Sequence, residues 1–173
     1  MHRRLATAPP FAAMLWALIL APPAAWAASP FSSPDGGYSA VFPVKPTEDI
    51  ENNANYRTVT ELADDGTTIW ATGHTIYAHD IDAAAELQAN AVTFAKEIGG
   101  TMVEPKSISF SRGRPDKLPA LEFTVDSDKL HGKGLTVVDG RRVLLIIAVC
   151  RKPNDRLGDI ERFLKTLKVA KLN

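Results

Sequence analysis

The sequence predicts an α+β fold in which an antiparallel β-sheet is covered by other layers on both faces. Segments of alternating apolar and polar residues are joined by Asp-Gly pairs at 65–66 and 139–140, which favour β-hairpin turns. Residues 143–149 contain no polar side chain, so both faces of this strand must be covered and it must lie centrally in the sheet. Two other segments carry apolar residues at helical spacing and supply the covering layers.

The expected strands are short and are bounded by turn-forming residues. The first ends at Pro43, because proline cannot donate to a sheet ladder. A later segment alternates Tyr, Thr, Thr and Leu with Arg57, Val59 and Glu61, which suits a strand with one wetter face. The strands are expected at residues 38–42, 56–62, 67–79, 102–110, 120–126, 135–138 and 141–150.

Two helices are expected, one in the middle of the chain and one near its end. Asp80 and Asp82 offer side-chain oxygens to the free amides of a helix start, and the Gly-Gly pair at 99–100 ends that helix. Asn154 or Asp155 caps the closing helix. The two apolar stripes consist of Ala84, Leu87, Ala91, Phe94 and Ile98 in the first helix and Leu157, Ile160, Phe163, Leu164 and Leu167 in the second.

Residues 1–27 have the three zones of a cleavable signal peptide in the right order. His-Arg-Arg at 2–4 is followed by an uncharged apolar run at 11–20, which is too short to span a bilayer of roughly 20 residues. The small residues around Trp26 place cleavage after Ala27, with Ala28 as the near alternative. An uncleaved anchor is the other interpretation, and no cysteine near the junction supports a lipoprotein. We therefore expect a periplasmic or secreted protein with no stable membrane insertion after cleavage.

The exported chain is expected to be one domain with a nearly neutral surface. Residues 28–37 form a short leader and residues 38–170 the domain. Removal of two arginines with the signal leaves 18 basic against 20 acidic residues, a formal charge of −2. This balance argues against nucleic acid and anionic membranes as partners. Cys150, the single cysteine, follows an apolar run and is expected to be a buried, unreactive thiol without an intramolecular disulfide.

Both ends of the domain resemble the PsbP-like family. The start, FSSPDGGYSAVFP at 31–43, resembles that family's opening turn and short strand, and RRVLLII at 141–147 with IERFLKTL at 160–167 resembles its central strand and closing helix. The resemblance implies an αβα sandwich, the fold shared by an extrinsic photosystem II subunit and Mog-type proteins that bind the GTPase Ran. No partner-binding residue of either branch matches this chain, which looks most like exported bacterial members that act as accessory proteins.

No catalytic residues, cofactor or metal site is expected. His74 and His79 are five residues apart on one strand, so their side chains point to opposite faces and cannot share a metal ion. The aspartates that follow His79 are explained as helix caps. The carboxylate pairs at 64–65 and 126–128 border turns, where aspartate commonly bonds local backbone amides. The sequence has no G-x-S-x-G nucleophile motif and no glycine-rich phosphate loop that opens a helix.

Two places carry the binding hypotheses. Trp70 and His74 share a strand face, where a semi-buried histidine with satisfied hydrogen bonds or a ligand pocket between sheet and helix are the alternatives. The loop at 111–119 offers candidate partner contacts in Arg112, Arg114, Asp116 and Lys117. We expect a non-catalytic accessory or protein-interaction module of the cell envelope, with an unidentified envelope protein as partner. A small-ligand binding protein is the alternative, and an enzyme of unrecognised type is the third hypothesis.

The signal peptide predicts the mass of the exported protein. When the full chain is expressed in a Gram-negative host, the periplasmic protein should begin at Ala28 or Ser29. Intact-mass spectrometry of the periplasmic fraction measures this directly. A soluble periplasmic protein with the mass of the full chain would contradict it.

Overall fold

The computed structural model describes residues 29–171, so the predicted signal peptide lies outside the described residues. These residues form two antiparallel sheets and two helices, α1 (Ala83–Glu97) and α2 (Leu157–Thr166). The smaller sheet has the order β1-β2-β10 and consists of β1 (Ser29–Ser33), β2 (Tyr38–Phe42) and β10 (Lys168–Val169). The larger sheet has the order β3-β4-β5-β9-β8-β7-β6. Its strands are β3 (Thr47–Asn52), β4 (Tyr56–Asp64), β5 (Thr68–Tyr77), β6 (Thr101–Phe110), β7 (Leu118–Asp126), β8 (Leu130–Asp139) and β9 (Arg142–Arg151).

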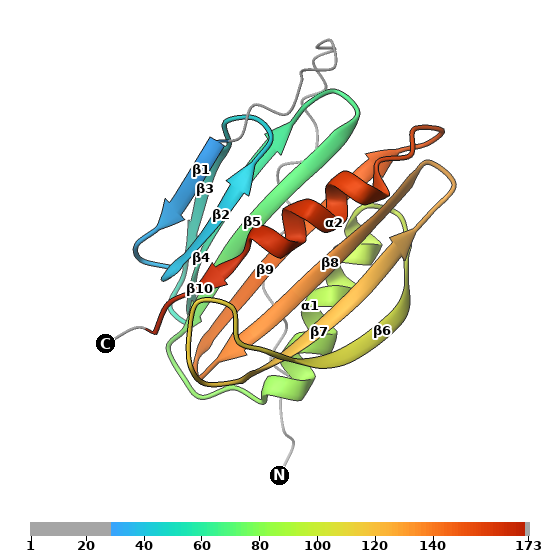
Figure 1. Ribbon diagram of the computed structural model, residues 1–173. Coiled ribbons are helices and arrows are strands. Elements are labelled where there is room, and N and C mark those ends of the chain that lie inside the picture. The colour runs from blue at the N-terminus through green and yellow to red at the C-terminus, as the bar shows by residue number, and fades with distance from the viewer. Residues whose placement is uncertain (1–28, 172–173) are drawn as a thin grey trace.

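The predicted αβα sandwich with a helical layer on each face is wrong. Strands make up 53% of the described residues and helices 17%, and these residues form two sheets instead of one. The small sheet lies beside α2 over the front of the large sheet in Figure 1, whereas α1 lies behind it. The physical reason is strand pairing outside the large sheet: β1, within the predicted leader, pairs with one edge of β2, and the distant β10 pairs with the other edge. Strand β2 therefore never joins the large sheet.

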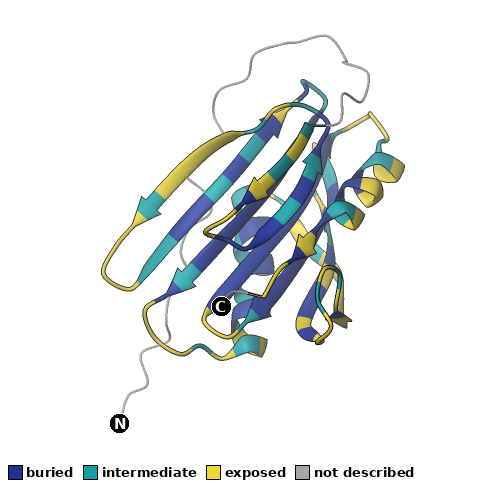
Figure 2. Ribbon diagram, turned by 60° about the vertical axis from the view of Figure 1, so that its left-hand side comes forward, coloured by how far each residue is buried: buried dark blue, intermediate teal, exposed yellow. Residues whose placement is uncertain are grey.

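The predicted central strand is confirmed as the middle of the large sheet. Strand β9 lies between β5 and β8, and nine of its ten residues are buried. One face of the sheet packs against α1 through Leu145 and Ile147, and the other packs against α2 and the small sheet through Leu144 and Ile146. The exposed edge strand β3 and the buried inner strands contrast clearly in Figure 2. Cys150 is buried and is a free thiol, as expected.

Both predicted Asp-Gly hairpins and the start of the first helix are confirmed. Gly66 and Gly140 have φ values of 86° and 61°, which glycine adopts without a steric penalty. The Asp82 side chain caps α1 by accepting from the amides of Ala84 and Ala85. At α2 the cap differs: Asp155 accepts from the Leu157 amide at 3.1 Å, but Arg156 occupies the N-cap position.

Arg142, the first residue of β9, holds the small sheet against the large one. Its side chain donates to the carbonyls of Gly36 and Gly37 in the turn between β1 and β2, and to the Ala170 carbonyl beyond β10 at 3.1 Å. The residue is 3% exposed, and Asp139 balances its charge. A buried guanidinium with these partners fixes three distant segments at one point.

Replacing Arg142 with methionine should therefore loosen the small sheet. We expect Arg142→Met to lower the free energy of unfolding by about 3 kcal/mol, because buried carbonyls lose their donor and Asp139 loses a charge partner. Arg141→Met is the matched control, since Arg141 is exposed and makes one 3.2 Å bond to the Ala78 carbonyl. Its effect should stay below about 0.5 kcal/mol in the same urea titration. Equal effects of the two substitutions would contradict the role given to Arg142.

Candidate functional site

A buried polar cluster lies between the two sheets. Tyr38 of β2 donates its hydroxyl hydrogen to Glu61 Oε2 of β4, and Thr72 of β5 donates to the same oxygen at 2.7 Å. Glu61 and Thr72 are fully buried and face each other in the β4–β5 register. The second carboxylate oxygen, Glu61 Oε1, has no hydrogen-bond partner among the described residues. Sequence reasoning missed this cluster because Glu61 was assigned to an alternating strand with one wetter face, and the sequence did not indicate that a second sheet would cover it.

Burial favours the neutral form of Glu61. Loss of solvation raises the pKa of this carboxyl from its usual 4.5 to about 7, and the nearby Glu48 adds to the shift. The hydrogen bonds from Tyr38 and Thr72 favour the carboxylate and act in the opposite direction. Burial likewise raises the pKa of the Tyr38 hydroxyl well above its usual range. The cluster therefore holds a proton near neutral pH.

His74, next to this cluster on β5, is a buried imidazole without hydrogen bonds. It is 0% exposed, and neither ring nitrogen has a partner among residues 29–171. The prediction of a semi-buried histidine with satisfied hydrogen bonds is therefore wrong. Burial lowers the pKa of His74 from 6.5 to about 4, and the nearby Arg57 lowers it further. The ring meets Tyr38 edge-on, with centroids 5.9 Å apart, and is neutral above about pH 4.

A glycine allows the β1–β2 turn to cover His74. A Cβ atom at Gly36 would lie 2.6 Å from His74 Nδ1 and 2.6 Å from the Tyr38 ring, so no larger residue fits without movement. Beside this turn, a cavity of about 150 Å³ opens between β1 and strands β3 to β5. Its lining includes His74 and the charged side chains of Asp35, Glu48 and Arg57.

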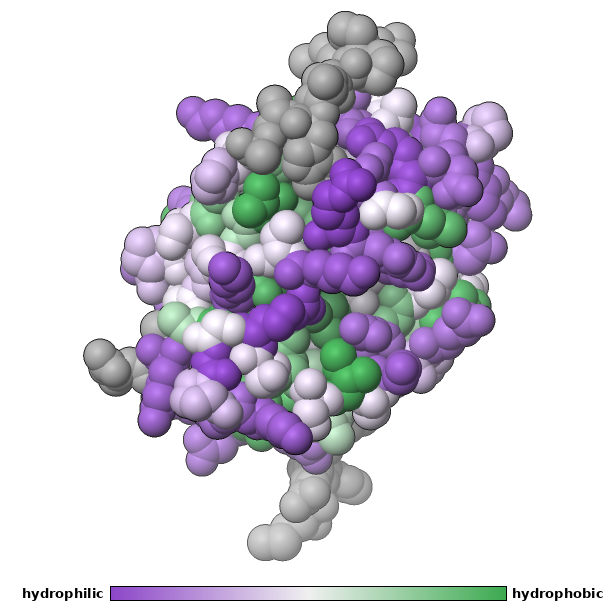
Figure 3. All heavy atoms as spheres, in the orientation of Figure 1, coloured by the Kyte–Doolittle hydropathy of each residue, from purple (hydrophilic) through white to green (hydrophobic). Residues whose placement is uncertain are grey.

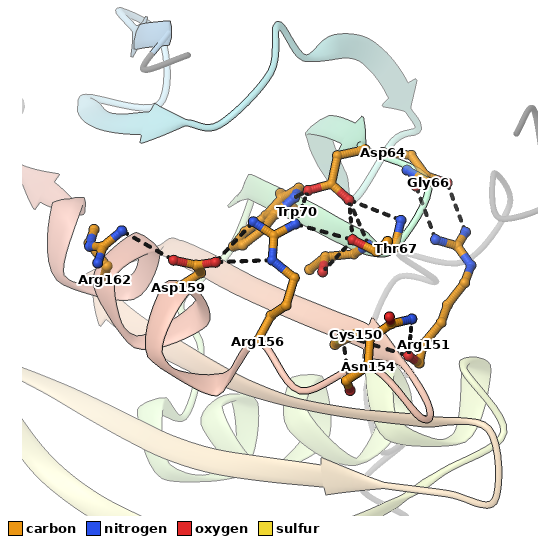
Figure 4. Close-up of polar contacts among 12 residues, drawn as sticks. Asp64, Gly66, Thr67, Trp70, Cys150, Arg151, Asn154, Arg156, Asp159 and Arg162 are labelled. Carbon is orange, nitrogen blue, oxygen red and sulfur yellow. Dashed lines mark hydrogen bonds and ion pairs between the residues drawn. The ribbon is translucent and has the colours of Figure 1, made fainter. Parts of the chain in front are cut away.

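Trp70 does not line this cavity, although it shares a sheet face with His74. It is fully buried against Phe163 of α2, and its Nε1 donates to Asp65 Oδ2 at 3.1 Å. The Arg156 guanidinium lies over the indole ring, 5.4 Å from its centroid, and also bonds Asp65 and Asp159. Figure 4 shows Arg156 joining the start of α2 to the β4–β5 turn. This arrangement fixes α2 in place.

A second candidate site is a groove of about 470 Å³ between α2 and strands β6 to β8, here called the α2 groove. Figure 3 shows hydrophilic side chains in a band over this face, with hydrophobic side chains between them. Lys133 of β8 and Glu161 of α2 form an ion pair across the groove. Its twelve lining residues are Glu104, Lys106, Arg112, Glu122, Phe123, Thr124, Lys133, Gly134, Leu135, Glu161, Leu164 and Lys165.

The floor of the α2 groove is formed by side chains on one face of β6, β7 and β8, which lie in rows across the three strands. In the first row, Ile108, Ala120 and Val137 are cross-strand neighbours on β6, β7 and β8, and the row is apolar. In the next row, Lys106 of β6 stands opposite Glu122 of β7. Directly opposed charges of unlike sign stabilise a sheet surface that stays in water. The face thus changes from packing residues to charged residues along the strands, and the groove begins where this change occurs.

The four candidate partner-binding residues of the loop at 111–119 have different surroundings in the structure. Arg112 lines the α2 groove, donates to the Leu164 carbonyl at 2.8 Å and lies over the Phe110 ring. Arg114 pairs with Asp116 and with Asp139, and its side chain is 3% exposed. Both guanidinium groups thus have partners inside the domain, whereas Lys117 is exposed. The role of all four residues in partner binding stays a prediction. Of the four, Arg112 lines the α2 groove.

Within residues 29–171, no group of three or more His, Cys, Asp or Glu side chains is placed so that it could hold a metal ion. None of the helices in this range is long and apolar enough to cross a membrane. The aspartates at 64 and 65 occupy the turn positions expected for them, because Asp65 accepts from the amides of Thr67 and Thr68 and Asp64 from that of Gly66.

Comparison with protein-family models finds no match for this chain. No curated protein matches it. Six chains of solved structures do match, among them a crystal structure of a protein from Bacteroides thetaiotaomicron VPI-5482, with 12% sequence identity and a TM-score of 0.33. That match covers 82% of this chain and 48% of the other, so this chain spans about half the length of its structural neighbour. A likeness at this TM-score carries no conclusion about fold or function, and the PsbP-like resemblance stays a prediction.

Glu61 and His74 should have opposite effects on the pH dependence of stability. The raised pKa of Glu61 adds stability that is full below about pH 4.5 and is lost as the pH rises through 7. The lowered pKa of His74 adds stability that is full above about pH 6.5 and is lost as the pH falls through 4. Between pH 4.5 and 6.5 the two slopes cancel, since folding moves one proton from the histidine to the carboxyl.

Single substitutions should reveal each slope. The unfolding free energy of Glu61→Gln minus that of the wild type should rise by about 3 kcal/mol from pH 4.5 to pH 6.5. For His74→Phe the same difference should fall by a similar amount. Urea titrations at pH 4.5, 5.5 and 6.5 measure both, and comparison with the wild type at each pH removes other groups such as Glu97. The opposite pKa shifts of Glu61 and His74 are refuted if the unfolding free energy of each variant differs from that of the wild type by the same amount at all three pH values.

Proposed function

We propose that this protein is an exported, non-catalytic interaction module of the cell envelope that binds an extended segment of a partner protein in the α2 groove. The observation that carries the proposal is the groove itself, about 470 Å³ and lined by seven charged side chains. The positive charges come from Lys106, Arg112, Lys133 and Lys165, and the negative charges from Glu104, Glu122 and Glu161. Side chains of both signs along one open groove suit a polar peptide segment.

Two cations in the groove are available for a partner. Within the part of the chain that the structure describes, Lys106 and Lys165 form no ion pair, although both are exposed. Lys133 is already paired with Glu161, and Arg112 is held by the Leu164 carbonyl. The groove carries one more positive than negative charge, which favours a segment with acidic residues.

The partner segment contacts side chains and is not added as a further strand. Strand β6 is an edge of the large sheet, but its pairing shifts register between Val103 and Lys106. Glu104 within this bulge has φ 52°, and Pro105 lacks an amide hydrogen. Bulges, proline and charge are the features by which edge strands avoid pairing with other chains. Specificity therefore depends on the charged groove beside β6.

The signal-peptide pattern at residues 1–27 and the PsbP-like resemblance support the envelope location and the accessory role. Lys133 and Glu161 are held by each other and Arg112 by the Leu164 carbonyl, which supports a preformed groove for binding. A small molecule would find little enclosure in an open groove of this kind, whereas binding pockets bury most of a ligand's surface.

Photo-crosslinking in living cells tests the proposal. A photo-reactive amino acid in place of Lys165 should form a discrete adduct with one envelope protein, because position 165 lines the groove. The same replacement at Lys96 is the control, since this exposed residue belongs to α1 on the opposite face. Adding Lys106→Glu should reduce the adduct at position 165 at least about fivefold by repelling acidic groups, whereas Lys129→Glu should not. The same adducts from positions 165 and 96, or none from 165, would refute the proposal.

A further inference from the structure

The α2 groove is closed at one end and open at the other. Where α2 meets the loop after β6, the backbone carbonyl of Arg112 accepts from the Val169 amide of β10 at 2.9 Å. Buried apolar side chains fill the space at this end, and they belong to Phe110, Leu118 and Leu167. At the other end of the groove, Glu104 and Glu161 are exposed. A chain lying in the groove therefore stops at Arg112, which marks the closed end.

The charges of the groove are divided between its two ends. Lys106 and Glu122 face each other in the row next to the closed end, and Lys165 belongs to the last turn of α2. Together with Arg112, the closed end carries three positive charges and one negative charge. The three charged residues further out comprise two acids and one lysine. The closed end therefore attracts an anion, whereas the open end does not.

Arg112 is a half-buried cation that forms no ion pair with the described residues. Its Nη1 donates to the Leu164 carbonyl at 2.8 Å, and its guanidinium lies 4.8 Å from the centroid of the Phe110 ring. These contacts hold the guanidinium in place and use one of its five N–H donors. Burial lowers the pKa of Arg112, and the charge of Glu122 acts in the opposite direction. Because a partly desolvated cation gains from a counter-ion, Arg112 is the strongest anion-binding group of the groove.

We propose that the α2 groove binds the C-terminal segment of its partner protein, with the terminal carboxylate on Arg112 at the closed end. This inference rests on the proposed function and names the part of the partner that is recognised. A carboxylate matches the planar guanidinium through two parallel hydrogen bonds. An N-terminal ammonium group would meet like charges at this end. A segment from the middle of a chain would have to continue where buried side chains leave no space.

The charge division also predicts the sequence of the bound segment. Lys106 and Lys165 are exposed and form no ion pair with the described residues, so they match acidic side chains close to the partner's C-terminus. A second copy of this chain does not fit this pattern. Its last six residues, KVAKLN at 168–173, contain two lysines and no acid. The occupant is therefore a different protein with an acidic C-terminal segment.

Mapping the crosslink in living cells tests the inference. The photo-reactive amino acid at position 165 lies at the closed end, so its adduct should contain the last few residues of the partner. Mass spectrometry of the digested adduct identifies the crosslinked peptide. A peptide from the interior of the partner overturns the inference and leaves the groove as a binding site. A peptide from a second copy of this chain also overturns it, and without a specific adduct the proposed function falls as well.

Peptide binding measures the contribution of the terminal carboxylate. A synthetic peptide with the last ten or so residues of the crosslinked protein is prepared with a free carboxylate and with a C-terminal amide. Both are titrated against the purified protein by fluorescence anisotropy. We expect the amide to bind at least about tenfold more weakly, because it lacks the charge-assisted pair with Arg112. Equal affinities overturn the proposal.

Arg112→Gln separates recognition of the carboxylate from the contact of Arg112 with the Leu164 carbonyl. The variant should bind the acid and the amide equally, whereas Lys117→Gln, at an exposed position in the same loop, should keep the tenfold difference. A purely structural effect on α2 would weaken both peptides alike and preserve their ratio, and that result overturns the role of Arg112. The comparison of acid and amide on the wild-type protein needs no variant, so it decides the proposal even if Arg112→Gln does not fold.

Discussion

The structure depends on the docking of the small sheet against the large one, and Arg142 is the residue that fixes it. Burying a guanidinium costs free energy unless its charge and its donors are matched. Here Asp139 supplies the charge, and backbone carbonyls of the β1–β2 turn and the C-terminal segment take the hydrogen bonds. Asp139 also pairs with Arg114, so the loop between β6 and β7 belongs to the same network. One buried charge thus orders three segments that lie far apart in the sequence.

The same docking changes the chemistry of the residues beneath it. Glu61 and His74 would be ordinary charged groups on an open strand face, but the small sheet removes their water. The carboxyl then keeps a proton and the imidazole gives one up, so the cluster as a whole is uncharged. Two buried groups that exchange a proton on folding avoid the larger cost of burying two unpaired charges. The turn that covers them also forms the outer wall of the cavity beside His74.

Local patterns were sufficient to predict the large sheet's centre and its turns. Strand β9, both Asp-Gly hairpins and the capped start of α1 depend on residues close in sequence, and these predictions are confirmed. The small sheet could not be predicted in this way, because β2 pairs with Val169, more than a hundred residues away. The exposed edge strand β3 carries no alternating apolar pattern and gave no signal.

In the candidate sites, too, some residues could be recognised from the sequence, but their surroundings could not. His74 was recognised because histidine is rare and distinctive, but its burial and the role of Glu61 depend on the unpredicted second sheet. Arg112 lies in the α2 groove and its partner contact stays a prediction, whereas the internal pairing of Arg114 depends on Asp139 in another hairpin. Side-chain identity along one strand can suggest a site. The partners that decide its protonation and exposure come from elsewhere in the fold.

The positions of the two sites follow from where the front face of the large sheet is covered. The small sheet covers β4 and β5, and α2 packs on β8 and β9, so the outer part of β6 and β7 has no covering element among the described residues. The sequence matches this division: apolar side chains fill the covered part of the face, and Lys106 and Glu122 begin where the cover ends. The Glu61–His74 cluster therefore lies buried under the small sheet, whereas an open groove forms beyond α2. That groove can accept an extended segment, because Lys106, Glu122 and Lys165 along it are exposed.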